Sequence, residues 1–187
     1  RIITDPVVAD GRIFTIDSAG RVSATSTSGS ALWSYSIVPL RDDASQALAG
    51  GLAVDNGRLY VTSGFGTLTA LDAATGREIW TQRLEATATG APSVFGGLVY
   101  VVAGDSTAWA IEAEDGRVRW QSDGLGDIGN VAGAAPPAVN DSHVVFSFGS
   151  GAVQGAFRQG GPRLWSPDIV AARPALPLAF VAAPPRS

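Results

Sequence analysis

A tryptophan that follows a glycine by four residues occurs four times along this chain of 187 residues. The four pairs are Gly29–Trp33, Gly76–Trp80, Gly116–Trp120 and Gly161–Trp165. Successive tryptophans are 47, 40 and 45 residues apart. A nearly constant interval of this length is typical of proteins built from one repeated structural unit, in which each unit buries its apolar face against its neighbours.

Each repeat predicts four short β-strands. In the third repeat we expect strands at 92–95, 98–103, 107–113 and 117–121, the second of which is almost continuously apolar. Turn residues precede the second strand of every repeat, and the dipeptides among them favour two-residue hairpins with positive φ. These turns are Asp10-Gly11, Asn56-Gly57, Gly96-Gly97 and the longer Asn140-Asp141-Ser142. An aromatic residue then lies 19 or 20 positions before each tryptophan, at Phe14, Tyr60, Tyr100 and Phe146.

Four strands in each repeat of about 40 to 47 residues predict an all-β fold, a β-propeller with four-stranded antiparallel blades. We expect a partial propeller over residues 1–170, with about four blades at 5–34, 51–81, 91–121 and 136–166. The last 17 residues, 171–187, contain four Pro and six Ala but no hairpin turn and no Trp strand, so we expect a tail outside the blades. The chain is therefore expected to be a fragment of a longer protein.

Composition argues against several classes of function. The net charge is −4 and all 13 basic residues are scattered arginines, which argues against nucleic-acid binding. The absence of Cys excludes disulfides and thiolate chemistry. The single histidine, His143, stands at a hairpin, and no Gly-x-Ser-x-Gly motif accompanies it, so a serine-hydrolase site is not expected. Asp123 and Asp127 leave a calcium site open as an alternative to an ordinary turn.

The segment Ala70-x-Asp72-x-x-Thr75-Gly76-x-x-x-Trp80 resembles the tryptophan-docking motif of quinoprotein-type (PQQ-like) propeller repeats. The resemblance covers about 160 residues and implies a propeller. Asp72 and Thr75 are suited to satisfy backbone groups of the turn, and Gly76 supplies its positive φ. Trp80 is then expected to pack on the neighbouring blade, with its N–H on a carbonyl. The same docking role is expected of Trp33, Gly116, Trp120, Gly161 and Trp165.

Quinoprotein dehydrogenases with this repeat carry pyrroloquinoline quinone, calcium and, in many cases, a vicinal disulfide. The present chain has no Cys for that disulfide and shows no convincing cluster of Asp, Glu and Asn at matching blade positions. We therefore expect no catalytic residues, no cofactor and no metal. A segment of a quinone-dependent dehydrogenase stays open as the enzymatic alternative.

Among quinone-free relatives the chain most resembles the BamB family, the scaffold lipoproteins of the outer-membrane β-barrel assembly machinery. Segments of the fourth repeat carry this resemblance, at 133–137, 148–154 and 157–161. The resemblance implies a periplasmic, outer-membrane-associated scaffold that contacts the periplasmic domains of the central barrel protein. Candidate contact residues are Asn130, Val131 and Gly133, which correspond to the family's contact stretch, and Arg41, Asp42 and Asp43 in a polar connector. A generic periplasmic binding module stays open as a third alternative, and we expect an open arc of blades to self-associate.

Overall fold

The computed structural model describes residues 2, 4–39, 50–88, 90–124, 135–148, 152–160 and 163–165. For residues 163–165 it describes the backbone alone. Every regular element in these residues is a β-strand, and the sixteen strands form four separate sheets of four. Each sheet is an antiparallel meander in which strands adjacent in sequence are hydrogen-bonded neighbours. The fold is thus all-β, and each sheet corresponds to one blade of a propeller.

The four blades have similar strand lengths. The first contains β1 (Val7–Ala9), β2 (Arg12–Ile16), β3 (Arg21–Ser26) and β4 (Ala31–Ser36). The second contains β5 (Leu52–Asp55), β6 (Arg58–Ser63), β7 (Thr67–Asp72) and β8 (Glu78–Arg83). The third contains β9 (Ser93–Phe95), β10 (Leu98–Val102), β11 (Thr107–Glu112) and β12 (Val118–Asp123). The fourth contains β13 (Ala138–Val139), β14 (His143–Ser147), β15 (Val153–Phe157) and β16 (Arg163–Trp165).

Backbone chemistry explains the first hairpin of the first three blades. Both central residues of each hairpin have positive φ, for example 47° at Asn56 and 73° at Gly57. Asn, Asp and Gly adopt this region most easily, and the resulting turn matches the twist of the two strands that it joins. The fourth hairpin is longer. There the Asn140 carboxamide oxygen accepts the backbone N–H groups of Ser142 and His143.

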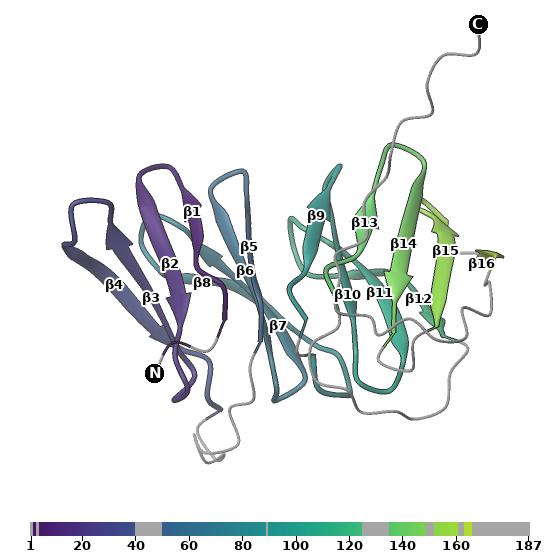
Figure 1. Cartoon of the computed structure of the whole chain (residues 1–187), viewed down its shortest axis with the longest axis horizontal. Coiled ribbons are helices and arrows are strands. Elements are labelled where there is room, and N and C mark those ends of the chain that lie inside the picture. Colours follow the sequence, from purple (N-terminus) through teal and green to yellow (C-terminus); the bar gives the residue numbers. More distant parts are fainter. Residues whose placement is uncertain are drawn as a thin grey trace, which may run out of the picture.

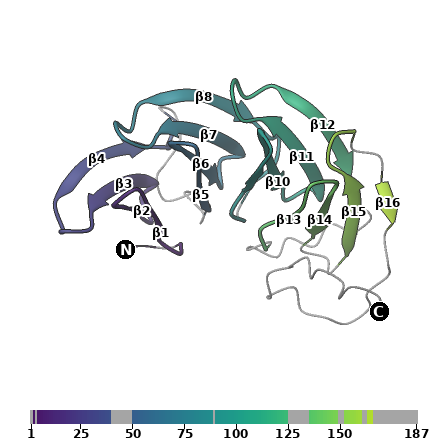
Figure 2. The same ribbon diagram turned by 90° about the horizontal axis from the view of Figure 1, so that it is seen from above.

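The blades follow one another along an arc. Figure 2 shows that the last strands of the blades, β4, β8, β12 and β16, lie along its outer side, whereas first strands such as β1 and β5 lie toward its inner side. Figure 1 shows the neighbouring sheets stacked face to face, with the chain passing once along the series. This arrangement is a partial propeller.

The hydrophobic core lies between the blades. Three apolar clusters fill the three junctions, and the one with the most buried residues joins the second and third blades through residues such as Tyr60, Leu68, Trp80 and Trp109. A middle strand therefore contributes to two junctions, one on each face. All five residues of β10 are buried for this reason, which explains its unbroken apolar sequence.

In every blade the strand register pairs the tryptophan with one residue on each of the other three strands, and these four residues form a row across the sheet. In the second blade the row is Ala53, Tyr60, Ala70 and Trp80. One residue before each tryptophan the last strand contains a β-bulge, formed by Leu32, Ile79, Arg119 and Leu164. A bulge inserts one extra residue and changes the direction of the strand. No pattern in the sequence predicts these bulges.

The position of Phe146 corrects one feature of the predicted repeat. The pairing Val145↔Gly155↔Trp165 places Val145, and not Phe146, in the row with the tryptophan. Neighbouring residues of a strand point to opposite faces, so Phe146 faces back toward the third blade. There its ring lies 6.4 Å from Tyr100 and 5.9 Å from Trp120. The other three aromatics contact the tryptophan of their own blade.

Candidate functional sites at the junctions between blades

Each described junction contains an indole hydrogen bond to the next blade. The Trp33 N–H donates to the Ala73 carbonyl over 3.1 Å, and the Trp80 N–H donates to the Ala113 carbonyl over the same distance. The Trp120 N–H donates to the Arg158 carbonyl over 2.9 Å. A buried indole needs such an acceptor. The three acceptors occupy the same place, the first residue of the turn between the third and fourth strands.

The turn glycine contacts the same indole. A β-carbon at Gly76 would stand 2.5 Å from Cδ2 of Trp33, and one at Gly116 would stand 2.7 Å from Cδ2 of Trp80. The glycine of one blade therefore receives the tryptophan of the preceding blade, and not its own. We call the turn carbonyl and the turn glycine together the indole seat. Ala73 and Gly76 form the seat of the second blade, and Ala113 and Gly116 form that of the third.

Asp72 holds the seat of the second blade in shape. Its carboxylate Oδ1 accepts the backbone N–H groups of Ala74 and Thr75 and the Thr75 hydroxyl, over 2.8 to 3.0 Å. These bonds, led by the one from the Thr75 hydroxyl, lower the pKa of Asp72 below its usual value because they stabilise the ionised carboxylate. Asp72 and Thr75 thus act within the turn.

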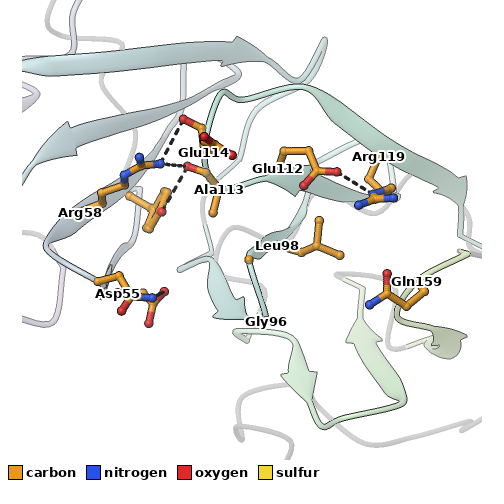
Figure 3. A pocket seen from close by; sticks show the side chains of 12 residues that line it. Asp55, Arg58, Gly96, Leu98, Glu112, Ala113, Glu114, Arg119 and Gln159 are labelled. Carbon is orange, nitrogen blue, oxygen red and sulfur yellow. Dashed lines mark hydrogen bonds and ion pairs between the residues drawn. The ribbon is translucent and has the colours of Figure 1, made fainter.

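A polar pocket of about 410 Å³ lies beside the junction of the second and third blades. Figure 3 shows that the hairpin near Asp55, the hairpin at Gly96, and the turn that carries Ala113 and Glu114 surround it. Gln159 lines it from the fourth blade. Its charged residues are Asp55, Arg58, Glu112, Glu114 and Arg119. The lining thus combines charges of both signs with the side-chain amides of Asn56 and Gln159.

Arg58 forms one wall of this pocket and crosses the junction. Its Nη1 donates to the carbonyl oxygens of Ala113 and Glu114. Tyr60 also reaches the Ala113 carbonyl, at 3.5 Å, and burial raises the pKa of its phenol. The repeat spacing singles out Tyr60 as the aromatic residue of the second blade, but not its contact with this carbonyl. For Arg58 the sequence holds only one signal, its place just after the Asn56-Gly57 turn.

The opposite wall contains a second arginine, Arg119, which is the bulge residue of β12. Its Nε donates to the Glu112 carboxylate over 2.6 Å. A third arginine, Arg158, extends from the fourth blade over the Phe95 ring, with its guanidinium carbon 5.1 Å from the ring centroid. A side chain at Gly96 would collide with that guanidinium. Arginines thus tie the hairpin side of both junctions of the third blade.

On the outer side of the arc, Tyr35 of β4 donates its phenol to the Glu78 carboxylate of β8. The other carboxylate oxygen of Glu78 accepts the Thr81 hydroxyl over 3.0 Å. Burial, together with the bond to Glu78 and its negative charge, raises the pKa of Tyr35 to about 12. This pair fastens the first blade to the second at their outermost strands.

The residues expected to contact a partner, Arg41, Asp42, Asp43, Asn130, Val131 and Gly133, lie outside the described residues, as do Gly161, Asp127 and the predicted tail at 171–187. The side chain of Trp165 is likewise not described, although its backbone pairs with Gly155 in β16. The described motif residues Trp33, Ala70, Asp72, Thr75, Gly76, Trp80, Gly116 and Trp120 all lie at junctions or in their turns.

His143 begins β14 and stacks near Phe157, with 5.6 Å between the ring centroids. In the described ranges no three His, Cys, Asp or Glu side chains come together in a way that could hold a metal ion. No helix in these ranges is long and apolar enough to cross a membrane.

Residues 18–184 match a family model described as outer membrane protein assembly factor BamB. The chain is also 38% identical over 104 residues to the quinohemoprotein alcohol dehydrogenase of Comamonas testosteroni. That match covers 48% of this chain and 14% of the dehydrogenase, so the chain spans only a small part of that relative's length.

Solved structures show the same fold. The crystal structure of BamB from Moraxella catarrhalis aligns with a TM-score of 0.71 and 21% identity, over 88% of this chain and 47% of that one. The Comamonas testosteroni dehydrogenase aligns with a TM-score of 0.70 and 22% identity, over 89% of this chain and 34% of that one. Because the family model matches most of the chain, the protein belongs to the BamB family of PQQ-like propellers.

Proposed function

We propose that this chain is a non-enzymatic interaction propeller that assists the assembly and insertion of β-barrel proteins into the outer membrane. The observation that carries the proposal is the match of residues 18–184 to the BamB family model. Its place of action would be the periplasmic face of the outer membrane. Its partner would be the periplasmic part of the central barrel protein in the assembly machinery.

The junction chemistry supports a scaffold. The tryptophans, the turn glycines, Arg58 and the Tyr35–Glu78 pair all join one blade to another. They give the arc a defined shape, so the blades from which the connectors start are held at fixed spacings. We assign partner binding to two of these connectors, through Arg41, Asp42 and Asp43 in one and Asn130, Val131 and Gly133 in the other.

The test is binding of the purified chain to the isolated periplasmic domains of the barrel protein, measured by calorimetry. We expect saturable binding that Val131→Asp weakens at least tenfold, which is about 1.4 kcal/mol. The matched control is Val118→Asp, which adds the same charge at an exposed valine on β12. Absence of binding, or equal losses for the two variants, would contradict the proposed contact.

A second candidate is a segment of a quinone-dependent dehydrogenase, and the 38% identity to a quinohemoprotein alcohol dehydrogenase favours it. Titrating the chain with pyrroloquinoline quinone and calcium distinguishes the two candidates. The scaffold predicts no saturable change in the quinone absorbance. A saturable change with one quinone per chain would support the dehydrogenase instead.

A further inference from the structure

The polar pocket beside the junction of the second and third blades has charges that the repeat itself does not require. Asp55, one of its carboxylates, ends β5 and stands opposite Arg58 in the hairpin. The strand register places Ala9 at the equivalent position of the first blade and Phe95 at that of the third. The hairpin therefore forms without an acidic residue at this position.

Glu112, a second carboxylate of the pocket, does not have the role of its counterpart. The strand register places it where the second blade has Asp72. Asp72 accepts hydrogen bonds from its own turn, whereas the Glu112 carboxylate receives the Arg119 guanidinium beside the pocket (Figure 3). In the third blade Asp115 accepts a backbone N–H of the turn instead. The Glu112 carboxylate is thus not used to hold its turn.

Arg119 and Glu114 also differ from their counterparts. The bulge residues of the other three blades are apolar, namely Leu32, Ile79 and Leu164. Glu114 stands two residues after Glu112, where the second turn has Ala74. Four of the five charged residues of the pocket therefore occupy positions at which the neighbouring blades are uncharged or use the charge within a turn. Because these four residues meet at one cavity, a binding role accounts for them.

The charges of the lining do not cancel. Three carboxylates stand against two guanidinium groups, which leaves a net charge of −1. Glu112 forms an ion pair with Arg119 over 2.6 Å, and Nη1 of Arg58 donates to two backbone carbonyls. Within the described part of the chain neither Asp55 nor Glu114 forms an ion pair. Two carboxylates of the pocket are therefore available to a cation.

We propose that this pocket binds the guanidinium group of an arginine side chain from another protein. Asp55 and Glu114 accept its N–H groups, because hydrogen bonds between a cationic donor and a carboxylate are among the strongest in proteins. Oδ2 of Asp55 already accepts the Asn56 carboxamide over 2.8 Å, which leaves Oδ1 for the ligand. The inference does not depend on the proposed function, and none of these residues is among those assigned to partner binding there.

The shape of the site fits an arginine. A guanidinium has five N–H donors in a planar fork and can bond two carboxylates at once, which a lysine ammonium does less well. The volume of about 410 Å³ has room for one such side chain and part of the chain that carries it. The contact of Arg58 with the Ala113 and Glu114 carbonyls and the pair of Arg119 with Glu112 hold the walls without a ligand.

The experiment is a titration of the 187-residue chain with the peptide acetyl-Gly-Gly-Arg-Gly-Gly-amide, followed by amide NMR spectra. We expect saturable shifts of the amide signals of Gly96, Gly97 and Glu114, which line the pocket. The affinity should fall as salt is added, because salt screens the charges. The same peptide with lysine should bind more weakly, and the peptide with glutamine should give no saturable shifts.

Two variants test the acceptors. Glu114→Gln and Asp55→Asn should each raise the dissociation constant by about three- to tenfold, because each removes one charged acceptor. Glu85→Gln is the matched control, since Glu85 is exposed and lies outside the pocket. The Glu114 side chain forms no hydrogen bond within the described residues, so Glu114→Gln should leave the fold intact. Thermal unfolding verifies that each variant is folded.

Other outcomes would overturn the proposal. The absence of saturable shifts with the arginine peptide means that Asp55 and Glu114 are only solvated carboxylates. Equal affinity for the glutamine peptide, or equal effects of Glu114→Gln and Glu85→Gln, means that the charge of the pocket is not used. Shifts confined to residues outside the lining mean that the peptide binds elsewhere. Saturable binding of spermidine, with none of the arginine peptide, means that the ligand is a free amine and not a protein side chain.

Discussion

Gly76 in the second blade lies against the indole of Trp33 in the first, so that a β-carbon at residue 76 would stand 2.5 Å from Cδ2 of that ring. The same relationship joins Gly116 to Trp80 at 2.7 Å. The glycine therefore has two roles, the positive φ of its own turn and the close approach of its neighbour's tryptophan. Each repeat of the motif is completed by the repeat before it.

This double role predicts a large effect of Gly76→Ala. The substitution strains a residue with φ of +72° and displaces a packed indole, so we expect a loss of about 2–4 kcal/mol in the free energy of unfolding. Urea denaturation measures it. Gly57→Ala is the control, because Gly57 has φ of +73° with open space around it. Gly57→Ala should lower the free energy of unfolding by about 1–2 kcal/mol. Equal losses would contradict a packing role for Gly76.

Arg58 should stabilise the junction of the second and third blades. Arg58→Met keeps the aliphatic stem but removes the bonds to the Ala113 and Glu114 carbonyls. We expect Arg58→Met to lower the free energy of unfolding by about 1–2 kcal/mol. Arg12→Met is the matched control. Arg12 begins the equivalent strand of the first blade, and its guanidinium bonds only the Asp10 carbonyl of its own hairpin in the described structure. Arg12→Met should change the free energy of unfolding by no more than about 0.5 kcal/mol. A loss for Arg12→Met as large as that for Arg58→Met would contradict the junction role of Arg58.

Tyr35 predicts a loss of stability in alkali. Burial, together with the bond to Glu78 and its negative charge, raises the pKa of Tyr35 from 10.0 to about 12, so the folded protein holds this proton more tightly than the unfolded chain. The contribution is complete below pH 10 and disappears as the pH rises through 12. Urea midpoints between pH 9 and 12 measure it. Tyr35→Phe should remove this part of the pH dependence, while Tyr60 and Tyr100, whose pKa values are also raised, keep theirs. Parallel curves for wild type and Tyr35→Phe would refute the assignment.

Ser106 predicts a stabilising substitution. It has φ of +66° in a turn where the first and second blades have Gly20 and Gly66, at +68° and +71°. Serine is strained in this region, so Ser106→Gly should stabilise the protein by about 1 kcal/mol. Ser106→Ala should change stability by less than about 0.5 kcal/mol, since it keeps the strain. A destabilised glycine variant would show instead that the serine hydroxyl is needed. Thermal unfolding of the three proteins decides the question.

The local parts of the fold follow from the sequence. The turn residues, the apolar β10 strand and the four-strand repeat depend on contacts between residues close in the chain, and they indicate the propeller class. The predicted strands of the third repeat agree with β9 to β12 to within two residues at each end. The docking motif also indicates which tryptophans lie at junctions.

Other features depend on contacts across blades. Phe146 had a spacing like that of Phe14, Tyr60 and Tyr100, yet the strand register pairs Trp165 through Gly155 with Val145, one residue earlier. The Phe146 ring therefore lies on the opposite face. Gly96 looks like a turn residue in the sequence. Asp10 and Asn56 occupy the same place with similar φ, so the backbone alone does not require glycine there. A side chain there would meet the guanidinium of Arg158, sixty-two positions later in the chain, and that guanidinium would have to move.

The candidate sites likewise include features that follow from the sequence and features that depend on contacts across blades. The sequence by itself determined the repeat, the fold class and the docking tryptophans, because a hairpin and its aromatic spacing are encoded within about 40 residues. Only the tertiary structure decided which glycine receives which indole and where the pocket beside Arg58 forms. The physical reason is that each of these features is shared by two blades, and their alignment depends on how the sheets stack.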